Sequence, residues 1–330
     1  MHKTVLLNET IEGLLAPQKA GNEKLVIVDA TFGGGGHSWE ICKRYPGVKI
    51  IALDQDQSAL EKAKSKFKDL NCNITFINAN FRELDHLENF GAFAQNSPAK
   101  DFGKYALRDI GQGTHFSQNP LQANSIDGII FDLGLSSDQL ENSGRGFSFQ
   151  KDEPLLMTLK ENPTSGDVTA QEVVNTWGEK SLADIIYGYG EEKQARKIAK
   201  AIVEFRKKQE IKTTFDLVKV IEQAIPAKFR KGKIHYATKT FQAIRIAVNN
   251  ELGTLTEGLD KGFKSLKAGG RMSVISFHSL EDRIVKRFFK KKAEENLAKL
   301  INKKPIVAKL EEIKNNPRSR SAKLRILERK

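Results

Sequence analysis

A glycine-rich string at residues 29–38, DATFGGGGHS, is the part of the sequence best suited to hold a ligand. It directly follows an apolar run at residues 25–29 and precedes a stretch of helical pattern. Glycine lets the backbone pass close to a ligand and adopt dihedral angles that other residues avoid. A second apolar run, residues 48–54, ends in Asp54, where a carboxylate can accept hydrogen bonds from ribose hydroxyls. The order strand, glycines, helix, acid favours a nucleoside-binding turn over a flexible glycine loop.

Two kinds of nucleoside ligand are compatible with such a turn. A dinucleotide site prefers G-x-G-x-x-G, so that a helix N-terminus faces the pyrophosphate. Counted from Gly33 or Gly34, the third glycine is replaced by Ser38 or Trp39, and Asp29 would repel a pyrophosphate. S-adenosyl-L-methionine has no phosphate and carries a sulfonium and an ammonium group, which suit acids at strand ends. The residues therefore favour this methyl donor, and an NAD-dependent oxidoreductase is the alternative.

The elements that must position these residues alternate along the chain. Apolar runs predict strands at residues 25–29, 48–54, 74–78, 127–132 and 271–277, and helices are expected at 38–44 and 57–68. This rhythm predicts an α/β fold with right-handed crossovers and a mostly parallel, doubly wound sheet. Asp132 closes the fourth strand, at the switch point where open sheets bind ligands. The alternating tail 322–328 predicts an antiparallel edge strand.

Two segments interrupt this rhythm. Residues 90–125 are rich in small and polar residues without a clear period, which indicates a long surface insertion. After a loop at 133–149, apolar residues recur at helical spacing in 168–177, 193–206, 215–224 and from Thr238 onward. We therefore predict a sheet domain formed by residues 1–147 and 238–330, with a helical domain, 148–237, inserted into it.

Charge and composition restrict the partners. The 330-residue chain has a formal net charge of +13, and its Lys and Arg residues are concentrated in residues 191–239 and 286–330. Two separate basic blocks indicate contact with a nucleic acid. No apolar run approaches the ~20 residues that span a bilayer, and no secretory leader is recognised, so we expect a cytoplasmic protein without a membrane partner. Cys42 and Cys72 lack metal-ligand spacing, and we expect both to pack as free thiols, with no metal site.

Several long motifs resemble those of the bacterial 16S ribosomal RNA (cytosine-N4) methyltransferases. They are HKTVLL (2–7), DATFGGGGH (29–37), ALD (52–54), DGIIFDLGLSSDQL (127–140), RGFSF (145–149), TKTFQAIRIAVNNEL (238–252), SFHSLEDRIVKRFF (276–289) and NPRSRSAKL (316–324). The resemblance implies a class I methyltransferase (Rossmann-like) sheet with an inserted helical substrate-recognition domain, and frequent homodimers. It implies 16S ribosomal RNA or the small ribosomal subunit as partner. It also implies that the donor is bound by Gly35, Gly36, His37, Asp54, Phe81, Asp132 and Gln139.

Other residues are candidates for the substrate side of the reaction. Asp132 stands where other amino-methyltransferases keep an acid that binds the amine, so it is the catalytic candidate. The substrate candidates are His235, Lys239, Gln242, Arg245, Ser276 and His278. Lys239, Gln242 and Arg245 recur every third residue, and a solvated polar face is the alternative explanation of this spacing.

The chain departs from the family pattern in three places. Residues 156–160 read LMTLK where the family has D-M-R-M-D, Tyr236 replaces a proline after His235, and the connection over 90–125 is long. These departures leave a second alternative, a non-catalytic, ribosome-associated RNA-binding protein that keeps the methyltransferase fold.

Overall fold

The computed structural model describes residues 4–15, 25–68, 70, 72–86, 125–164, 166–232 and 234–330. The chain divides into two compact units. The first consists of Met1–Gly134 and Leu252–Lys330, and the second of Leu135–Glu251. The second unit extends beyond the predicted 148–237 at both ends. The insertion predicted over 90–125 lies outside the described residues, apart from Ser125.

The first unit is built on an eight-stranded sheet in the order β3-β2-β1-β4-β5-β8-β6, with β7 also paired to β8. Strands β1 to β5 are mutually parallel, as the apolar runs predict. The chain forms β2 and β3 on one side of β1 and then returns to form β4 and β5 on the other side. Because β1 pairs with β4, the strand ends that carry Asp29 and Asp132 are neighbours. The strands are β1 (Val26–Asp29), β2 (Lys49–Asp54), β3 (Asn73–Asn78), β4 (Ile126–Asp132), β5 (Leu266–Ser276), β6 (Ala298–Leu300), β7 (Ile306–Val307) and β8 (Lys323–Arg329).

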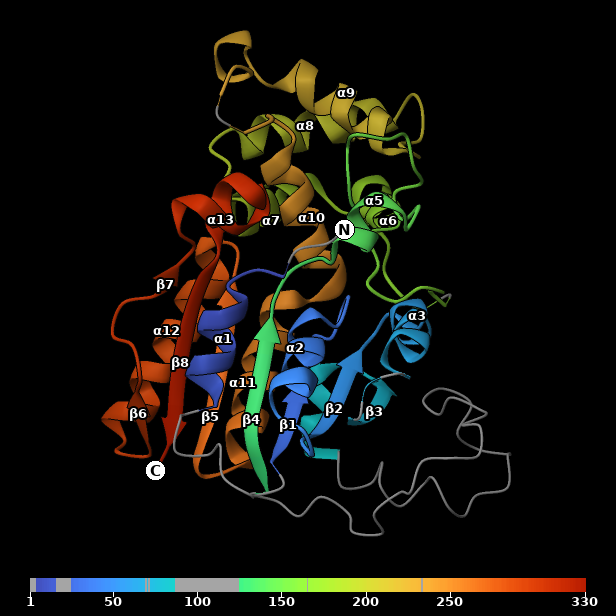
Figure 1. Cartoon of the computed structure of the whole chain (residues 1–330). Coiled ribbons are helices and arrows are strands. Elements are labelled where there is room, and N and C mark those ends of the chain that lie inside the picture. Colours follow the sequence, from blue (N-terminus) through green and yellow to red (C-terminus); the bar gives the residue numbers. More distant parts are fainter. Residues whose placement is uncertain are drawn as a thin grey trace. The chain divides into compact units, whose positions relative to one another are not determined.

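Helices cover both faces of this sheet (Figure 1). On one face, α1 (Leu7–Leu14), α2 (Gly36–Arg44) and α3 (Gln57–Phe67) pack over residues such as Ile27 and Ile50. On the other face, α11 (Glu251–Ser265) and α12 (Ser279–Glu294) pack over their chain neighbours Val28 and Ile51. Successive strand residues thus face opposite helical layers, which explains why the strands read as continuous apolar runs.

The tail strand β8 is antiparallel to β5, as predicted, but the prediction that it forms the sheet edge is wrong. The other side of β8 pairs with β6 and β7. These strands have only three and two residues, too few to produce a recognisable alternation in sequence. They satisfy backbone groups of β8 that an edge strand would expose.

The second unit is helical in its regular elements and has its own apolar core, which includes Leu182, Ile198 and Ile221. Its helices are α5 (Ser137–Glu141), α6 (Ala170–Thr176), α7 (Glu179–Gly190), α8 (Ala195–Arg206), α9 (Thr214–Ala224) and α10 (Thr238–Asn249). The loop predicted over 133–149 thus contains the short helix α5.

One apolar stripe from Thr238 onward is divided between two helices. Asn250, with φ of 46°, ends α10 in the left-handed conformation, and α11 follows. The C-terminal part of the first unit also contains α13 (Leu310–Asn315) and the 3₁₀ helix Pro317–Ser321. In the described part of the chain, no helix is both long and apolar enough to cross a bilayer.

Candidate functional site

The glycine turn connects β1 to α2, and its shape depends on glycine at two positions. Gly35 precedes α2 with φ of 67°, and a Cβ atom there would lie 2.3 Å from the Phe32 ring. A Cβ atom on Gly36 would lie 1.8 Å from Oγ1 of Thr4. The close contacts come from the chain itself, so packing of the first unit requires glycine at both positions.

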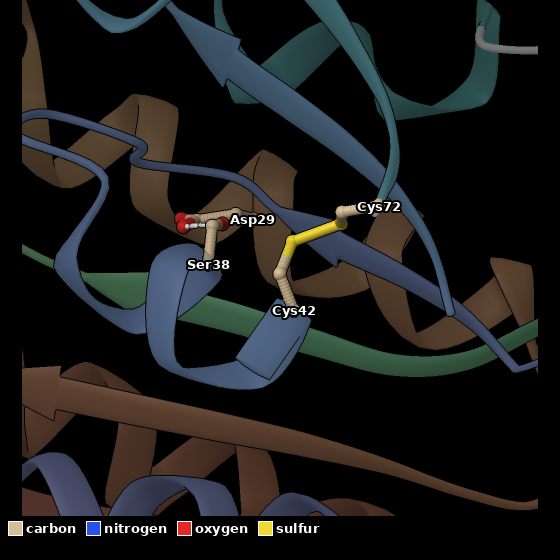
Figure 2. Close-up of a disulfide and its surroundings, with 4 residues drawn as sticks. All are labelled: Asp29, Ser38, Cys42 and Cys72. Atoms are coloured by element: carbon tan, nitrogen blue, oxygen red, sulfur yellow. Dashed lines mark hydrogen bonds between the residues drawn. A yellow bond between two sulfur atoms is a disulfide. The ribbon is translucent and has the colours of Figure 1, made fainter. Parts of the chain in front are cut away.

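Asp29 and Ser38 connect the two ends of this turn, since Asp29 is the last residue of β1 and Ser38 lies on α2. The Ser38 hydroxyl donates a hydrogen bond of 2.6 Å to Oδ2 of Asp29, and both side chains are buried (Figure 2). Burial raises the pKa of Asp29 to about 6, although the bonds from Ser38 and the Thr31 amide oppose this rise. Thr31 also accepts a 2.6 Å hydrogen bond from the backbone amide of Asp132, which joins the ends of β1 and β4.

Asp132 is the most perturbed acid of this edge. Burial, with smaller contributions from the charges of Asp29 and Glu281, raises its pKa to about 8. Its Oδ2 lies 3.6 Å from Nδ1 of His37, the second residue of α2. Among the described residues, Oδ1 of Asp132 has no hydrogen-bond partner. A buried carboxyl oxygen without a partner is unfavourable and indicates a place for a ligand.

Asp54 at the end of β2 is held by backbone amides. Oδ2 accepts a 2.7 Å hydrogen bond from the Gly33 amide, and Oδ1 accepts one of 2.8 Å from the Asp56 amide. Each carboxylate oxygen can accept a second bond, so ribose hydroxyls remain acceptable partners. The bond to Gly33 fixes Asp54 directly beside the glycine turn.

Phe81 follows β3 and is half-buried. Its ring packs edge-on against Phe131, with ring centroids 5.4 Å apart, and lies over Gly258 of α11. These contacts orient the ring firmly. They account for Phe81 as part of the core, and the role in adenine stacking stays a prediction.

The end of β5 contributes Ser276 and His278, and the structure adds Glu281, which the sequence analysis missed. Ser276 donates a long, 3.4 Å bond to the Lys323 carbonyl. Oε2 of Glu281 accepts bonds from the amides of Phe277 and His278, at 2.8 and 3.2 Å. His278 is in turn the N-cap of α12, and its Nδ1 accepts from the Glu281 amide. The sequence signal that could have revealed Glu281 is a capping box, H-x-x-E, in which a histidine takes the place of the usual Ser or Thr at the N-cap.

The remaining sequence-predicted residues belong to the second unit. Gln139 completes the capping box of α5, where its Oε1 accepts a 2.9 Å bond from the Ser136 amide. His235 stacks on Phe149 with ring centroids 4.5 Å apart. Burial lowers the pKa of His235, so a neutral imidazole is favoured at neutral pH.

The polar stripe of α10 makes contacts within its own unit. Lys239 and Gln242 donate to the carbonyls of Glu191 and Tyr189 at the C-terminal end of α7, each over 2.9 Å. Arg245 forms two hydrogen bonds, 2.8 and 2.9 Å long, with the Glu251 carboxylate. These bonds give the stripe a structural role, and its part in substrate binding stays a prediction.

A disulfide joins Cys42 to Cys72, so the prediction of two free thiols is wrong. Cys42 lies on α2 and Cys72 immediately before β3, and the two Cα atoms are 5.5 Å apart (Figure 2). Their separation of 30 residues in sequence gave no indication of this proximity. The bond tethers the helix that carries His37 and Ser38 to the neighbouring strand.

The acidic residues at this edge of the sheet suit a ligand that combines a positive charge with a nucleoside. Asp29, Asp54, Asp132 and Glu281 place four carboxyl groups at or just beyond the carboxyl ends of β1, β2, β4 and β5. Burial, together with the charges of neighbouring acids, raises the pKa values of Asp29 and Asp132. A sulfonium or ammonium group would supply a compensating positive charge, whereas a pyrophosphate would add to the repulsion. The residues therefore fit S-adenosylmethionine.

Comparisons with known proteins assign the family. The model of the MraW methylase family matches residues 1–330. The chain is 44% identical over 327 residues to ribosomal RNA small subunit methyltransferase H of Sulfurihydrogenibium sp. (strain YO3AOP1), covering 99% of this chain and 96% of that protein. It is 42% identical to the protein of the same name from Lactobacillus johnsonii, covering 99% and 98%.

Solved structures are more distant. A crystal structure of an rRNA methylase from Streptococcus thermophilus matches over 100% of this chain and 98% of that chain, with a TM-score of 0.42 and 12% sequence identity. The sequence comparisons carry the assignment, and they agree with the motifs that line the glycine turn. The chain belongs to the MraW methylase family.

Proposed function

We propose that this protein transfers a methyl group from S-adenosylmethionine to the N4 amine of a cytosine in 16S ribosomal RNA. Membership of the MraW methylase family and relatives named ribosomal RNA small subunit methyltransferase H support this proposal. The single structural observation that carries it is a buried carboxyl oxygen of Asp132, beside the glycine turn, that has no hydrogen-bond partner in the described part of the chain. It offers a buried acceptor at the ligand-binding edge of the sheet.

The chain's own residues would bind and orient the methyl donor. Asp54, held by the Gly33 and Asp56 amides, is oriented to accept ribose hydroxyls. Gly35, Gly36 and His37 form the close backbone surface, and Asp29 and Asp132 supply negative charge. S-adenosylmethionine, when bound, supplies a methyl carbon that is activated by the sulfonium. Phe81 and Gln139 complete the set of donor-binding residues that we propose.

Asp132 would act on the nucleophile. The exocyclic amine of cytosine is a weak nucleophile because its lone pair is delocalised into the ring. Holding the amine in line supplies much of the rate enhancement. An acceptor for its N–H, which later takes the proton, would contribute ~10²–10⁴-fold. With its pKa raised to about 8, Asp132 is protonated in the ligand-free protein at neutral pH; binding of the cationic donor would release this proton and leave a carboxylate that can accept one from the amine.

Each unit contains substrate candidates. His278 and Ser276 lie at the end of β5, next to the strand that ends in Asp132. His235, Lys239, Gln242 and Arg245 belong to the second unit, to which we assign substrate recognition. A homodimer and a cytoplasmic location remain predictions that follow from the family resemblance and the ribosomal substrate.

The LMTLK segment is held within its own unit mainly through its backbone. The amide of Met157, a residue that the family pattern also has at this position, donates a 2.7 Å bond to the Arg145 carbonyl. Arg145 donates to the carbonyls of Thr158 and Leu159. Of the substituted residues, Thr158 is buried, Leu156 and Leu159 are half-buried, and Lys160 is exposed and pairs with Asp167 over 2.7 Å. A measurement of methyl transfer decides between the proposed function and the non-catalytic alternative.

Methyl transfer to isolated small ribosomal subunits tests the proposed function. Purified protein and labelled S-adenosylmethionine are incubated with subunits, or with 16S ribosomal RNA, from a bacterium that lacks this methyltransferase. Nucleoside mass spectrometry should then show N4-methylcytidine. Label incorporated at another base would correct the target, and no incorporation with either substrate would support the non-catalytic alternative.

A further inference from the structure

The exposed face of α12 carries a stripe of positive charge outside the donor site. Arg283, Lys286, Arg287 and Lys290 are all exposed and follow the spacing i, i+3, i+4, i+7. This spacing places them on one side of the helix. Val285 and Phe289 on the opposite side are buried against the sheet. The stripe is therefore a separate surface feature and not part of the core.

Among the described residues, no acid pairs with Lys286 or Arg287 in the middle of this stripe, whereas Arg283 and Lys290 at its two ends have contacts within the chain. Asp282 is already paired with Arg325 and Lys323, at 2.7 and 3.2 Å. The acids in the last turn reach only the far end, where Lys290 pairs with Glu294 over 3.2 Å.

Like charges at this spacing lower the stability of a helix, because residues at i and i+4 lie side by side on its surface. A solubilising face would gain from interleaved glutamates, as the end of α12 has. Two cations without an acid partner among the described residues, Lys286 and Arg287, are instead suited to a polyanion.

The stripe lies on the helix that follows β5, and β5 is the neighbour of the strand that ends in Asp132. Asp132 at the end of β4 pairs in register with Ile275 of β5, and α12 begins three residues after β5 ends. From there the helix runs back along the sheet beside β6 and β8 (Figure 1). The stretch from Arg283 to Lys290 is about 10 Å long. A surface of this length can contact a few successive phosphates of one strand.

Resting on the function proposed above, we propose that this stripe binds the ribose-phosphate backbone of the RNA substrate next to the target nucleotide. The contact is to phosphates and carries no base specificity. It fixes the direction in which the strand leaves the site. The ligand class is an RNA strand, since the stripe offers charge without the apolar surface that a protein partner would cover.

The test compares two triple variants with the same change in net charge. The stripe variant is Lys286→Gln/Arg287→Gln/Lys290→Gln, and Arg283 is left unchanged. The control variant is Lys43→Gln/Lys62→Gln/Lys68→Gln, three exposed lysines on α2, on α3 and directly after α3, elements that pack on the opposite face of the sheet. Each variant includes one residue that already has an interaction within the chain: Lys290, which pairs with Glu294, in the stripe variant, and Lys62 in the control. Affinity for a 16S ribosomal RNA transcript is measured over a series of KCl concentrations, with S-adenosylmethionine affinity and thermal unfolding as checks of folding.

The stripe variant should bind RNA at least about tenfold more weakly at low salt, and the slope of log K against log salt should fall in magnitude by about 2. Its affinity for S-adenosylmethionine should be the same as that of the wild-type protein. Its midpoint of thermal unfolding at low salt should be equal to the wild-type value or higher. The control should retain most of the wild-type slope. Equal slopes for the two variants overturn the proposal while leaving the methyltransferase function intact. A wild-type protein that shows no salt-dependent RNA binding overturns both.

Discussion

Nδ1 of His37 and Oδ2 of Asp132 are 3.6 Å apart, so the second residue of α2 meets the last residue of β4 at the carboxyl edge of the sheet. The imidazole is buried, and the carboxyl group beside it has a pKa of about 8. An acid in this state can exchange a proton with a ligand at neutral pH. The first two predictions follow from this relationship.

Asp132→Asn should lower the rate of methyl transfer by about 10²–10⁴-fold, because the amide keeps the shape of the side chain but cannot accept the proton. Single-turnover transfer at saturating donor measures this rate. Asp184→Asn, an exposed position on α7, is the matched control. Wild-type turnover and donor affinity in Asp132→Asn would exclude the proposed role.

Binding of the donor should release a proton near pH 7. Asp132 and Asp29, with pKa values of about 8 and about 6, hold protons that a cationic ligand displaces. Affinity should therefore rise as pH increases from 6 to above 8. Calorimetry in buffers of different ionisation enthalpy counts the proton, and most of the effect should disappear in Asp132→Asn. A pH-independent affinity would contradict the assignment.

The same carboxyl groups should make the ligand-free protein less stable as pH rises from about 5 to about 8. Their pKa values are higher in the folded protein than the ordinary 3.8, so the folded state binds more protons in this window. Asp167, whose pKa is lowered to about 2 by Lys160 and Thr164, acts in the opposite direction only below this window. Urea unfolding at several pH values measures the trend, and rising stability across the window would refute it.

Gly36→Ala should weaken donor binding and lower the thermal midpoint, because the added Cβ would lie 1.8 Å from Oγ1 of Thr4. Thr4→Ala removes that oxygen, so the double variant should recover part of both losses. Gly188→Ala is the control for the glycine-to-alanine change itself, because Gly188 also lies in a helix, α7, and nothing lies within 4 Å of an added Cβ atom there. If the double variant were as impaired as Gly36→Ala, the steric explanation would be wrong.

Reduction of the Cys42–Cys72 disulfide should destabilise the protein. For a 30-residue separation, the chain-entropy model gives about 3–4 kcal/mol at 25 °C. Denaturant unfolding with and without a reductant measures the difference, and the Cys42→Ser/Cys72→Ser variant should not respond to the reductant. Two titratable thiols in native, unreduced protein would show that the bond does not form.

The parallel core of the sheet could be predicted from sequence, because strands buried on both faces are continuous apolar runs. The bounds predicted for β1 to β4 were correct to within one residue, whereas β5 begins at Leu266, five residues earlier than predicted. The acids that we propose for the donor site were selected for the same reason, since each one closes such a run. Helices α7 and α12 were missed: Gly178 precedes α7 without a side-chain cap, and α12 is capped by a histidine.

Features that depend on contacts distant in sequence could not be predicted. The disulfide, the pairing of β8 with β6 and β7, and the close approach of Thr4 to Gly36 arise only after folding. The contacts of Lys239 and Gln242 with the end of α7 belong to the same class, because the helix that accepts their bonds was not recognised. Glu281 was overlooked because the histidine-capped start of α12 was not recognised. Without that capping box, no position for the Glu281 carboxylate could be inferred.

The central claim is that carboxyl groups at the strand ends bind a cationic, phosphate-free nucleoside. Isothermal titration of the purified protein with S-adenosylmethionine and, separately, with NAD tests it most directly. We expect saturable binding of S-adenosylmethionine, weakened in Asp54→Asn, and no measurable heat with NAD. Tight NAD binding without binding of S-adenosylmethionine would contradict the account.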